Sequence, residues 1–571
     1  MGELTWTTAL PDWETRLLKG DSLIAVRPLF PTMANKAVMI LAKFVMADVI
    51  GKPRFGDVTQ QWVYDFVGAI FGSQDPQSFR RLINYFFLLI PKKNGKSTLA
   101  AGLMMTAMEM EMELGVRDYA EYLIIAPTKD IADNSFDVAK SIIENDAEMS
   151  LYYHVQPHTR TIKNLVSKST LQVMAADDKT VGGSKATGVL IDELHLFGKM
   201  ANAEAVLSEA TGGMVSRIDG FVIYLSTQSS EPPAGVFRAE LQMARDIRDG
   251  KIANPHYLPV LYEFPPAMVA SKDYENPQNF KLVNPNWGFS VDEKTLLTKY
   301  HKAKSSPEPA ALPEFFAKHL NVQTGVALRS QDWAGAEFWQ QNTVAELADL
   351  AVLIEQSEVL TVGIDGGGLD DLLGLAVVGR SRADGVTLLV WTHAWANPSV
   401  LARHQEIAPR LQDFATDGTA TLTAKYGDDV VELAEFVAQV HQSGKLAVIG
   451  VDTYGMKDIL NALETAGIAQ ADYVRGVPQG GQLTGTINET AKMLAKGTLK
   501  HGGGGMMAWV VGNAKVVEQG NNIRITKQVS GRGKIDPLMA LFDGMYPMLD
   551  NPPAPNVGMD TWLGNMVVSG A

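Results

Sequence analysis

The feature that most constrains this chain is an apolar run followed by a short basic loop and a helix-forming segment. Leu82–Ile90 (LINYFFLLI) has the composition of a buried strand, and Ser97–Met110 (STLAAGLMMTAMEM) is rich in good helix formers. A loop between such elements directs free backbone N–H groups and the positive end of the helix dipole at one point. The same alternation of short apolar runs and helical stretches continues to about residue 250, which predicts a parallel α/β sheet.

The loop at residues 90–97 (IPKKNGKS) carries most of the phosphate-binding pattern G-x-x-x-x-G-K-[ST]. In that pattern Lys96 would reach the outer phosphates of a nucleotide, and the Ser97 hydroxyl would ligate Mg²⁺. Gly95 would leave room for the nucleotide, because it has no Cβ. The first glycine of the pattern is missing, since Ile90 stands there. The alternative is an ordinary strand–helix turn that happens to contain Gly-Lys-Ser.

An acidic pair supplies what the loop alone lacks. Asp192 and Glu193 follow the apolar run Gly188–Ile191, which would lie beside the loop in such a sheet. Asp192 would then hold Mg²⁺ through water, and Glu193 would polarise the water that attacks the γ-phosphate. Ser226–Gln228 (STQ), after the next apolar strand, suits a sensor of the γ-phosphate. Each element could also be a plain strand end, but loop and acidic pair together predict ATP hydrolysis.

Three aspartates in the second half point to metal chemistry. Asp365 stands on a predicted strand beside glycines, Asp452 ends another strand, and Asp536 precedes a proline at a helix start. An RNase H-like fold would gather them, and two cations held ~3.5–4 Å apart by carboxylates can cleave a phosphodiester. Asp371 could add a ligand or an outer contact. Each aspartate alone could be an unpartnered strand end; the three in this order favour a nuclease.

We therefore expect an α/β protein in which a phosphate-loop NTPase domain with a parallel sheet is followed by an RNase H-like nuclease domain. The expected boundaries are 1–255 for the ATPase domain, 256–350 for a Pro- and Asn-rich linker or lid, 351–549 for the nuclease domain and 550–571 for a flexible tail.

Charge and composition narrow the functional classes. A net charge of −14 excludes a surface that is basic all over, and the absence of cysteine excludes disulfides and thiolate chemistry. No apolar run reaches the ~18–20 residues that span a bilayer, and the acidic N-terminus is not a secretory signal, so a cytoplasmic location is expected. Positive charge is concentrated in the window Arg524–Lys534 (RITKQVSGRGK). We expect four of its side chains to contact DNA phosphates, with a solvated face as the alternative: Arg524, Lys527, Arg532 and Lys534.

The loop, acidic pair, linker and aspartate cluster, in this order, resemble the large terminase subunit of tailed bacteriophages from about Gln61 to Leu549. That family tolerates a phosphate loop without its first glycine. The resemblance implies an ATP-driven motor that translocates double-stranded DNA into a procapsid and cuts the concatemer. It implies ATP with Mg²⁺ as cofactor and two Mg²⁺ or Mn²⁺ ions in the nuclease. The implied partners are double-stranded DNA, the portal protein, a small terminase subunit and further copies in a ring, usually a pentamer, with no membrane. The implied location is the cytoplasm of the infected bacterium, transiently on the portal and not in the mature virion.

The resemblance also implies residue roles. Gln61 and Trp62 resemble the segment that contacts adenine, and Lys92 stands where the family often has a basic residue near the phosphates. Ser226-Thr227-Gln228 resembles the coupling motif, and Arg217 is a candidate for the arginine that reaches a neighbouring subunit. His501, Asn513 and Lys527 match pattern positions without an assigned role. The implied nucleotide-binding set is Gln61, Trp62, Lys92, Asn94, Gly95, Lys96, Ser97, Thr98 and Asp192. The implied catalytic set is Lys96, Glu193, Asp365, Asp452 and Asp536; the last three also bind metal, and Ser97 binds the Mg²⁺ of ATP.

Three other functions remain open from the sequence. One is a helicase or other DNA-dependent ATPase with a structural second half. Another is a transposase-like recombinase, although its ATPase is usually a separate protein. The last is a capsid-associated scaffold with vestigial sites, against which the intact Lys96, Glu193 and three aspartates argue.

Overall fold

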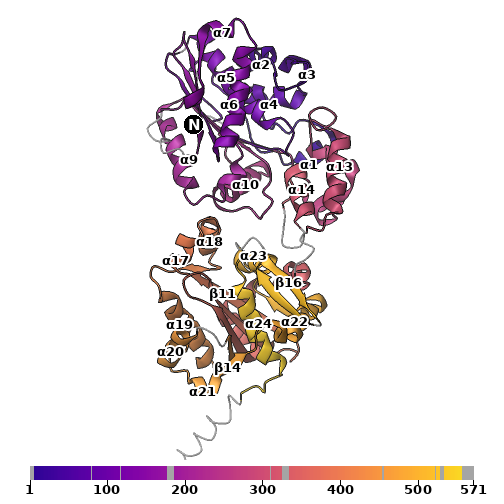
Figure 1. The fold of residues 1–571 in the computed structure, drawn as a ribbon, viewed down its shortest axis with the longest axis vertical. Coiled ribbons are helices and arrows are strands. Elements are labelled where there is room, and N and C mark those ends of the chain that lie inside the picture. The colour runs from indigo at the N-terminus through magenta and orange to yellow at the C-terminus, as the bar shows by residue number, and fades with distance from the viewer. Residues whose placement is uncertain are drawn as a thin grey trace, which may run out of the picture. The chain divides into compact units, whose positions relative to one another are not determined.

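The computed structural model describes residues 6–78, 80–115, 117–176, 185–308, 310–323, 333–452, 456–520, 522–527 and 533–555. The chain forms two compact units, Met1–Thr324 and Gly325–Ala571, which carry the indigo-to-pink and the pink-to-yellow colours in Figure 1. Among the described residues, no helix combines the length and the apolar character needed to cross a bilayer.

The first unit is built on an eight-stranded sheet of order β3-β4-β5-β2-β6-β7-β1-β8. From β5 to β8 in this order all neighbours are parallel, whereas β3 and β4 extend the sheet as antiparallel strands. The strands are β1 (Tyr85–Leu89), β2 (Glu121–Ala126), β3 (Tyr153–Gln156), β4 (Thr161–Asn164), β5 (Thr170–Ala175), β6 (Gly188–Ile191), β7 (Phe221–Ser226) and β8 (Tyr257–Leu261). The helices are α1 (Trp13–Lys19), α2 (Pro31–Lys43), α3 (Phe55–Val58), α4 (Gln61–Phe71), α5 (Lys96–Leu114), α6 (Lys129–Glu144), α7 (Met149–Tyr152), α8 (Leu194–Phe197), α9 (Ala203–Gly212), α10 (Gly235–Arg248), α11 (Pro266–Ala270), α12 (Phe280–Val283), α13 (Glu293–Lys304) and α14 (Ala311–Leu320).

Helix α5 shows why the loop before it is fixed in place. Almost every side chain from Leu99 to Glu111 is buried, so the helix is held on all sides rather than along one stripe. Its two buried acids are bonded: Glu109 accepts a hydrogen bond from Tyr153 at 2.7 Å, and Glu111 pairs with Arg117 at 3.0 Å. The N-terminus of α5 therefore presents the phosphate loop from a rigid support.

Residues 256–324, which the sequence assigned to a linker or lid, contribute to the first unit. β8 pairs with β1 along its whole length, and α11 to α14 follow it. The polypeptide after β7 therefore completes the sheet before it leaves the first unit.

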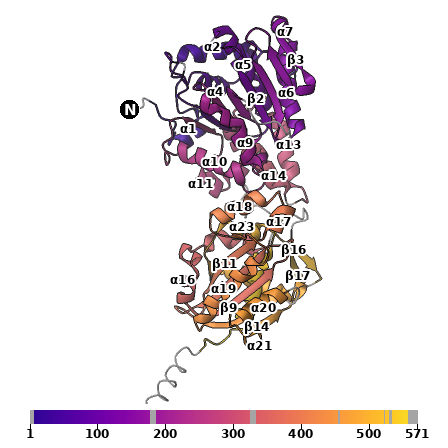
Figure 2. The same cartoon turned by 90° about the vertical axis from the view of Figure 1, so that its left-hand side faces the viewer.

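The second unit contains a sheet of order β12-β11-β10-β9-β13-β14, with β15 paired to β11, and a separate hairpin of β16 and β17. Figure 2 shows this hairpin at one side of the unit. The strands are β9 (Ser357–Gly366), β10 (Leu373–Ser381), β11 (Leu388–Ala396), β12 (Thr421–Leu422), β13 (Leu446–Asp452), β14 (Val474–Val477), β15 (Leu499–His501), β16 (Ala514–Gln519) and β17 (Asn522–Lys527). The helices are α15 (Gly335–Trp339), α16 (Leu350–Gln356), α17 (Pro398–Arg403), α18 (Ala408–Thr416), α19 (Asp428–Gln442), α20 (Lys457–Thr465), α21 (Gln470–Tyr473), α22 (Thr484–Lys496), α23 (Gly505–Asn513) and α24 (Asp536–Leu549).

Helices cover both faces of this second sheet. α19 and α20 share one hydrophobic core with it, and α22, α23 and α24 share another (Figure 1). α24 approaches the strands very closely, because glycines lie beneath it. A Cβ added at Gly363 would lie 2.0 Å from the carbonyl oxygen of Ala540, and one at Gly450 would lie 2.1 Å from that of Asp543. This contact seats α24 across β9 and β13.

Candidate active sites

The phosphate loop joins β1 to α5 in the predicted way. Gly95 has a φ of 79°, a left-handed conformation that glycine adopts at little cost. Lys96 is only 6% exposed, and its ammonium donates to the carbonyl of Ile90 at 3.4 Å and lies 3.9 Å from Glu193 Oε1. Burial lowers the pKa of Lys96, while the charges of Glu193 and Asp192 oppose that change. The loop and the acidic pair therefore meet at this ammonium group.

The acidic pair follows β6 directly. Asp192 is fully buried, and burial together with the charge of Glu193 raises its pKa. Burial alone would raise the pKa of Glu193 too, but Lys96 and a hydrogen bond from His195 outweigh it, so this pKa lies well below its ordinary value. His195 Nδ1 lies 3.3 Å from Glu193 Oε2, and Thr227 Oγ1 donates to the same oxygen at 3.4 Å. Glu193 is thus an ionised carboxylate held from two sides. His195 is not among the site residues predicted from the sequence, although it stands only two residues after Glu193.

The Ser-Thr-Gln segment connects the acidic pair to α14. Ser226 Oγ accepts a hydrogen bond from the backbone N–H of His195 at 3.0 Å. The backbone N–H of Gln228 donates to Asn321 Oδ1 at 3.0 Å, and the Asn321 amide donates to the carbonyl of Tyr262 at 2.9 Å. Asn321 is 2% exposed and caps the C-terminus of α14. A displacement of the acidic pair therefore has a bonded path to α14.

Residues from the region after β8 clamp the loop. Asn94 is 1% exposed; its amide donates to Asn284 Oδ1 at 2.8 Å, and its Oδ1 accepts from the N–H of Asn286 at 3.1 Å. Ser290 Oγ donates to the carbonyl of Lys93 at 2.6 Å. The Asn94 side chain is engaged with these protein groups and holds the loop in shape. Its place among the groups that touch a nucleotide stays a prediction.

The expected adenine segment borders a cavity. Trp62 is 9% exposed, donates from Nε1 to Asn286 Oδ1 at 2.8 Å and packs edge-on against Tyr262. Gln61 donates to Asp65 at 2.8 Å. A cavity of about 550 Å³ has Gln61, Trp62, Asp65, Tyr262 and Asn284 in its lining. Because Asn284 and Asn286 also hold Asn94, this cavity and the phosphate loop share the same support. Ser97 and Thr98 are partly exposed in the first turn of α5, and Lys92 is partly exposed nearby and helps to lower the pKa of Glu193.

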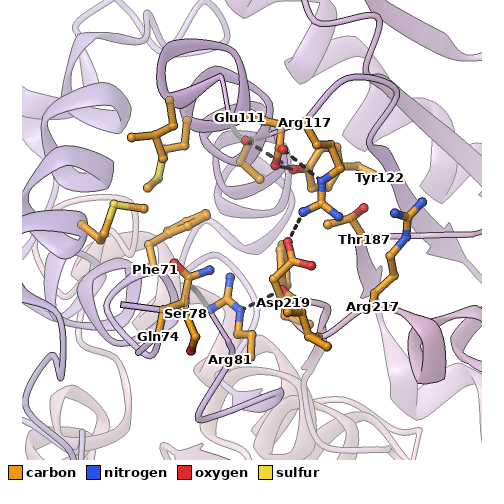
Figure 3. Close-up of a pocket in the computed structure, with 16 residues that line it drawn as sticks. Phe71, Gln74, Ser78, Arg81, Glu111, Arg117, Tyr122, Thr187, Arg217 and Asp219 are labelled. Carbon is orange, nitrogen blue, oxygen red and sulfur yellow. Dashed lines mark hydrogen bonds and ion pairs between the residues drawn. The ribbon is translucent and has the colours of Figure 1, made fainter. Parts of the chain in front are cut away.

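Arg217 lies near the amino ends of the central strands. It lines a cavity of about 460 Å³ whose wall includes Tyr122, Thr187 and Phe221, at the amino ends of β2, β6 and β7 (Figure 3). Its Nε donates to the carbonyl of Lys185 at 3.2 Å. The phosphate loop and the acidic pair lie at the carboxyl ends of the strands. Arg217 therefore does not reach the ATP site of its own chain.

In the second unit, the three predicted aspartates come together. Asp365 on β9 and Asp452 on β13 stand on adjacent parallel strands, where Val451 is paired with Ile364. Asp536 starts α24 and accepts a hydrogen bond from the N–H of Leu372 at 3.3 Å. Burial raises the pKa of Asp365 well above its ordinary value, and repulsion by the other aspartates raises it further. Like charges are thus concentrated at one place in the fold.

A fourth carboxylate, which was not predicted from the sequence, belongs to this cluster. Asp543 on α24 is fully buried, and its charge contributes to the raised pKa of Asp365. Burial chiefly raises the pKa of Asp543 itself, to about 8. Its position seven residues after Asp536 places both on one face of the helix, which was the signal available in the sequence.

The donor set suits hard divalent cations. Carboxylate oxygens are the ligands that such cations prefer, and Oδ2 of Asp543 is buried without a hydrogen-bond partner in the described part of the chain. Within the described ranges, no three acidic or histidine side chains already enclose one point as a metal-binding group. The carboxylates are neighbours whose mutual repulsion a cation would relieve.

One residue of the basic window Arg524–Lys534 is buried, contrary to the prediction that it contacts DNA. Lys534 is 3% exposed, and its ammonium is shared by Asp371 Oδ1 at 3.0 Å, His404 Nε2 at 3.2 Å and the carbonyl of Asp370. Its expected contact with DNA phosphates is wrong for this structure, because the charge is already neutralised inside the fold. Arg524 is exposed on β17. The Lys527 side chain and Arg532 lie outside the described residues.

Two further pattern positions have structural partners. His501 donates from Nε2 to the carbonyl of Trp339 at 2.9 Å and stacks on its ring with centroids 3.9 Å apart. Asn513 donates to the carbonyl of Lys534 at 3.1 Å, just before α24. Asn513 therefore helps to fix the segment that leads into Asp536, whereas His501 holds Trp339 of α15 against β15.

The two units together indicate the class of the protein, which combines a nucleotide hydrolase and a nuclease on one chain. The family described as terminase large subunit, ATPase domain, matches residues 61–232, and terminase large subunit, endonuclease domain, matches residues 260–550. The chain belongs to the terminase large subunit family and combines its packaging ATPase and endonuclease domains. The predicted resemblance and the predicted α/β fold class are confirmed.

Three similar proteins illustrate the distance to known relatives. Protein YmfN of Escherichia coli K12 is 21% identical over 375 residues, which are 63% of this chain and 77% of YmfN. The large terminase of bacteriophage HK97 is 17% identical, with 90% of this chain and 99% of that chain covered and a TM-score of 0.45. The large terminase of a thermophilic bacteriophage, solved in complex with ADP, is 13% identical, with 83% of this chain and 94% of that chain covered and a TM-score of 0.30.

Proposed function

We propose that this terminase subunit uses ATP hydrolysis in its first unit to drive double-stranded DNA into a procapsid, and a two-cation nuclease in its second unit to cut the concatemer. The observation that carries the proposal is the meeting of Lys96 and Glu193, 3.9 Å apart, from elements almost a hundred residues apart in the sequence. A buried lysine beside an ionised glutamate at the carboxyl edge of a parallel sheet suits phosphoryl transfer.

In the ATP site, Lys96 would bind the outer phosphates, and Ser97 and Asp192 would hold a Mg²⁺ ion that neutralises charge on them. Glu193 orients the attacking water and accepts its proton, a role for which its carboxylate must be ionised. The lowered pKa of Glu193 keeps it in that form, and His195 and Thr227 fix its direction. Gly95, Lys92 and Thr98 line the phosphates, and Gln61 and Trp62 contact adenine at the neighbouring cavity.

Coupling to movement follows from the bonded path beyond the acidic pair. Ser226, Thr227 and Gln228 contact His195, Glu193 and Asn321 respectively. A change at the γ-phosphate that moves Glu193 therefore moves α14. We propose that the chain divides by function into the ATPase residues 1–255, the linker or lid residues 256–350, the nuclease residues 351–549 and the tail residues 550–571.

In the nuclease site, Asp365, Asp452 and Asp536 would hold two Mg²⁺ or Mn²⁺ ions. Bound there, the cations would activate a water molecule and stabilise the leaving oxygen of the DNA backbone. The aspartates would provide the negative charge that binds them. Burial chiefly raises the pKa of Asp365, and repulsion by the neighbouring aspartates raises it further.

The partners follow from the family. Terminase large subunits act on DNA with the packaging machinery, and we extend this to the portal protein, a small terminase subunit and a pentameric ring of this chain. Arg217 faces away from its own ATP site, so any action on ATP would be on a neighbouring subunit. The proposed location is the cytoplasm of the infected bacterium, transiently on the procapsid portal.

The test is ATP hydrolysis with DNA, with and without procapsids, together with protection of the DNA from an added nuclease. We expect DNA and procapsids together to raise hydrolysis and to produce protected DNA, and Lys96→Ala to abolish both. Hydrolysis with duplex unwinding but no protection would favour a helicase, and strand-transfer products would favour a recombinase.

A further inference from the structure

Asp543 occupies an unusual place for an acid. It lies on α24 two helical turns after Asp536, about 10.5 Å further along the helix axis. Its backbone rests on β13, where its carbonyl would meet a Cβ at Gly450. β13 is the strand that ends in Asp452. Asp543 therefore extends the carboxylate cluster towards the Asp452 side.

The side chain of Asp543 is only half satisfied by the protein. Gln479 Nε2 donates to its Oδ1 at 3.0 Å. Its Oδ2 is out of reach of solvent and has no hydrogen-bond partner within the described ranges. Buried polar atoms are nearly always bonded, and leaving one without a partner costs stability. No Lys, Arg or His of the described residues forms an ion pair with Asp543, and the charged groups that face it are Asp365 and Asp452.

We propose that Asp543 is a fourth carboxylate of the nuclease centre and ligates a divalent cation together with Asp452. Gln479 holds one carboxylate oxygen and leaves the other directed at the cation. A Mg²⁺ or Mn²⁺ ion needs about six oxygen ligands, and a carboxylate oxygen beside Asp452 would supply one of them. This inference rests on the proposed nuclease function of Asp365, Asp452 and Asp536, and names a ligand beyond those three.

Mn²⁺ binding to the full-length protein without nucleotide tests the inference, by calorimetric titration and by melting with and without Mn²⁺. Asp543→Gln and Asp543→Glu have nearly equal volume and differ in charge. Asp550→Asn is the matched control, since Asp550 follows α24 and pairs at the surface with Arg475. We expect Asp543→Gln to weaken Mn²⁺ binding by about tenfold or more and to lose part of the Mn²⁺-dependent rise in melting temperature. Asp543→Glu should recover part of both, and the control should match the native protein.

The outcomes separate this inference from the proposed function. Native Mn²⁺ binding by Asp543→Gln, or a lower metal-free melting temperature with an unchanged Mn²⁺ increment, would assign a purely structural role to the carboxyl group and overturn the inference. If Asp365→Asn also binds Mn²⁺ like the native protein, the nuclease assignment itself fails. A measurement without substitution is anomalous scattering from Mn²⁺-soaked crystals. An ion on Asp365, Asp452 and Asp536, with Asp543 and its surroundings empty of Mn²⁺, contradicts the inference.

Discussion

Alanine at Gly450 should abolish most DNA cleavage while ATP hydrolysis continues. The added Cβ would lie 2.1 Å from the carbonyl oxygen of Asp543 and 2.9 Å from Val477 Cγ2. A carbon and a carbonyl oxygen normally approach to about 3.3 Å, so α24 and β13 must separate by roughly 1 Å. The nearest obstacle is backbone, which cannot turn aside as a side chain can.

The size of the effect follows from that separation. Overpacking of this kind costs about 1–3 kcal/mol, which in a unit of this size lowers the melting temperature by roughly 2–12 °C. The same shift moves Asp536 and Asp543 relative to the aspartates on the strands. A misplacement of about 1 Å at a reacting centre costs on the order of a hundredfold in rate.

The assays are Mn²⁺-dependent cleavage of plasmid DNA, ATP turnover and thermal melting of the same preparation. Gly485→Ala is the matched control, because nothing lies within 4 Å of its added Cβ in the first turn of α22. The control should cut DNA normally and be slightly more stable, by about 0.5–1 kcal/mol. If Gly450→Ala cleaves and melts like the native protein, α24 is not seated on β13 as described.

The other sites give further expectations. Glu193→Gln should bind ATP nearly normally and hydrolyse it about 10²–10⁴-fold more slowly; native turnover with native binding would remove Glu193 from catalysis. Burial raises the pKa of Asp543 to about 8. The unfolded chain therefore releases this proton from about pH 4 while the folded chain keeps it, so the metal-free nuclease unit should lose stability in urea melts between about pH 4 and about pH 8. Asp543→Asn should flatten that dependence, and an unchanged slope would contradict the assignment. Arg524→Gln should lower the magnitude of the log K versus log salt slope for DNA by about 1, whereas an unchanged slope would make Arg524 part of a solvated face.

Local pattern was enough to predict much of the fold. The run Leu82–Ile90 contains β1, Ser97–Met110 falls within α5, and Gly188–Ile191 is β6 itself. Each is an apolar segment bounded by glycine, proline or charge, and burial on all sides requires little more than such a run. The short strands β3 and β4 were not predicted, because only alternate residues of each strand face the core and neither forms an apolar run.

The sites were harder to predict, because their contacts join distant segments. Asn286 supports both Trp62 and Asn94 from about two hundred residues away, and no local pattern indicates it. Lys534 stands in a basic window that looks solvated. In the structure it is buried and donates to Asp371, which lies in the connection between β9 and β10. Asp543 resembles a helix surface acid until the packing of α24 is known. Partners of charged residues depend on tertiary structure, whereas strands and helices depend mainly on neighbours in sequence.

The most direct test of the account is whether the two activities separate between the two units of the full-length protein. We predict that Asp365→Asn, Asp452→Asn and Asp536→Asn each abolish metal-dependent DNA cleavage while ATP hydrolysis persists. Lys96→Ala should do the reverse, with cleavage in Mn²⁺ but no ATP turnover. If all three aspartate variants still cut DNA at the native rate, these carboxylates are not the nuclease centre and the account of the second unit is wrong.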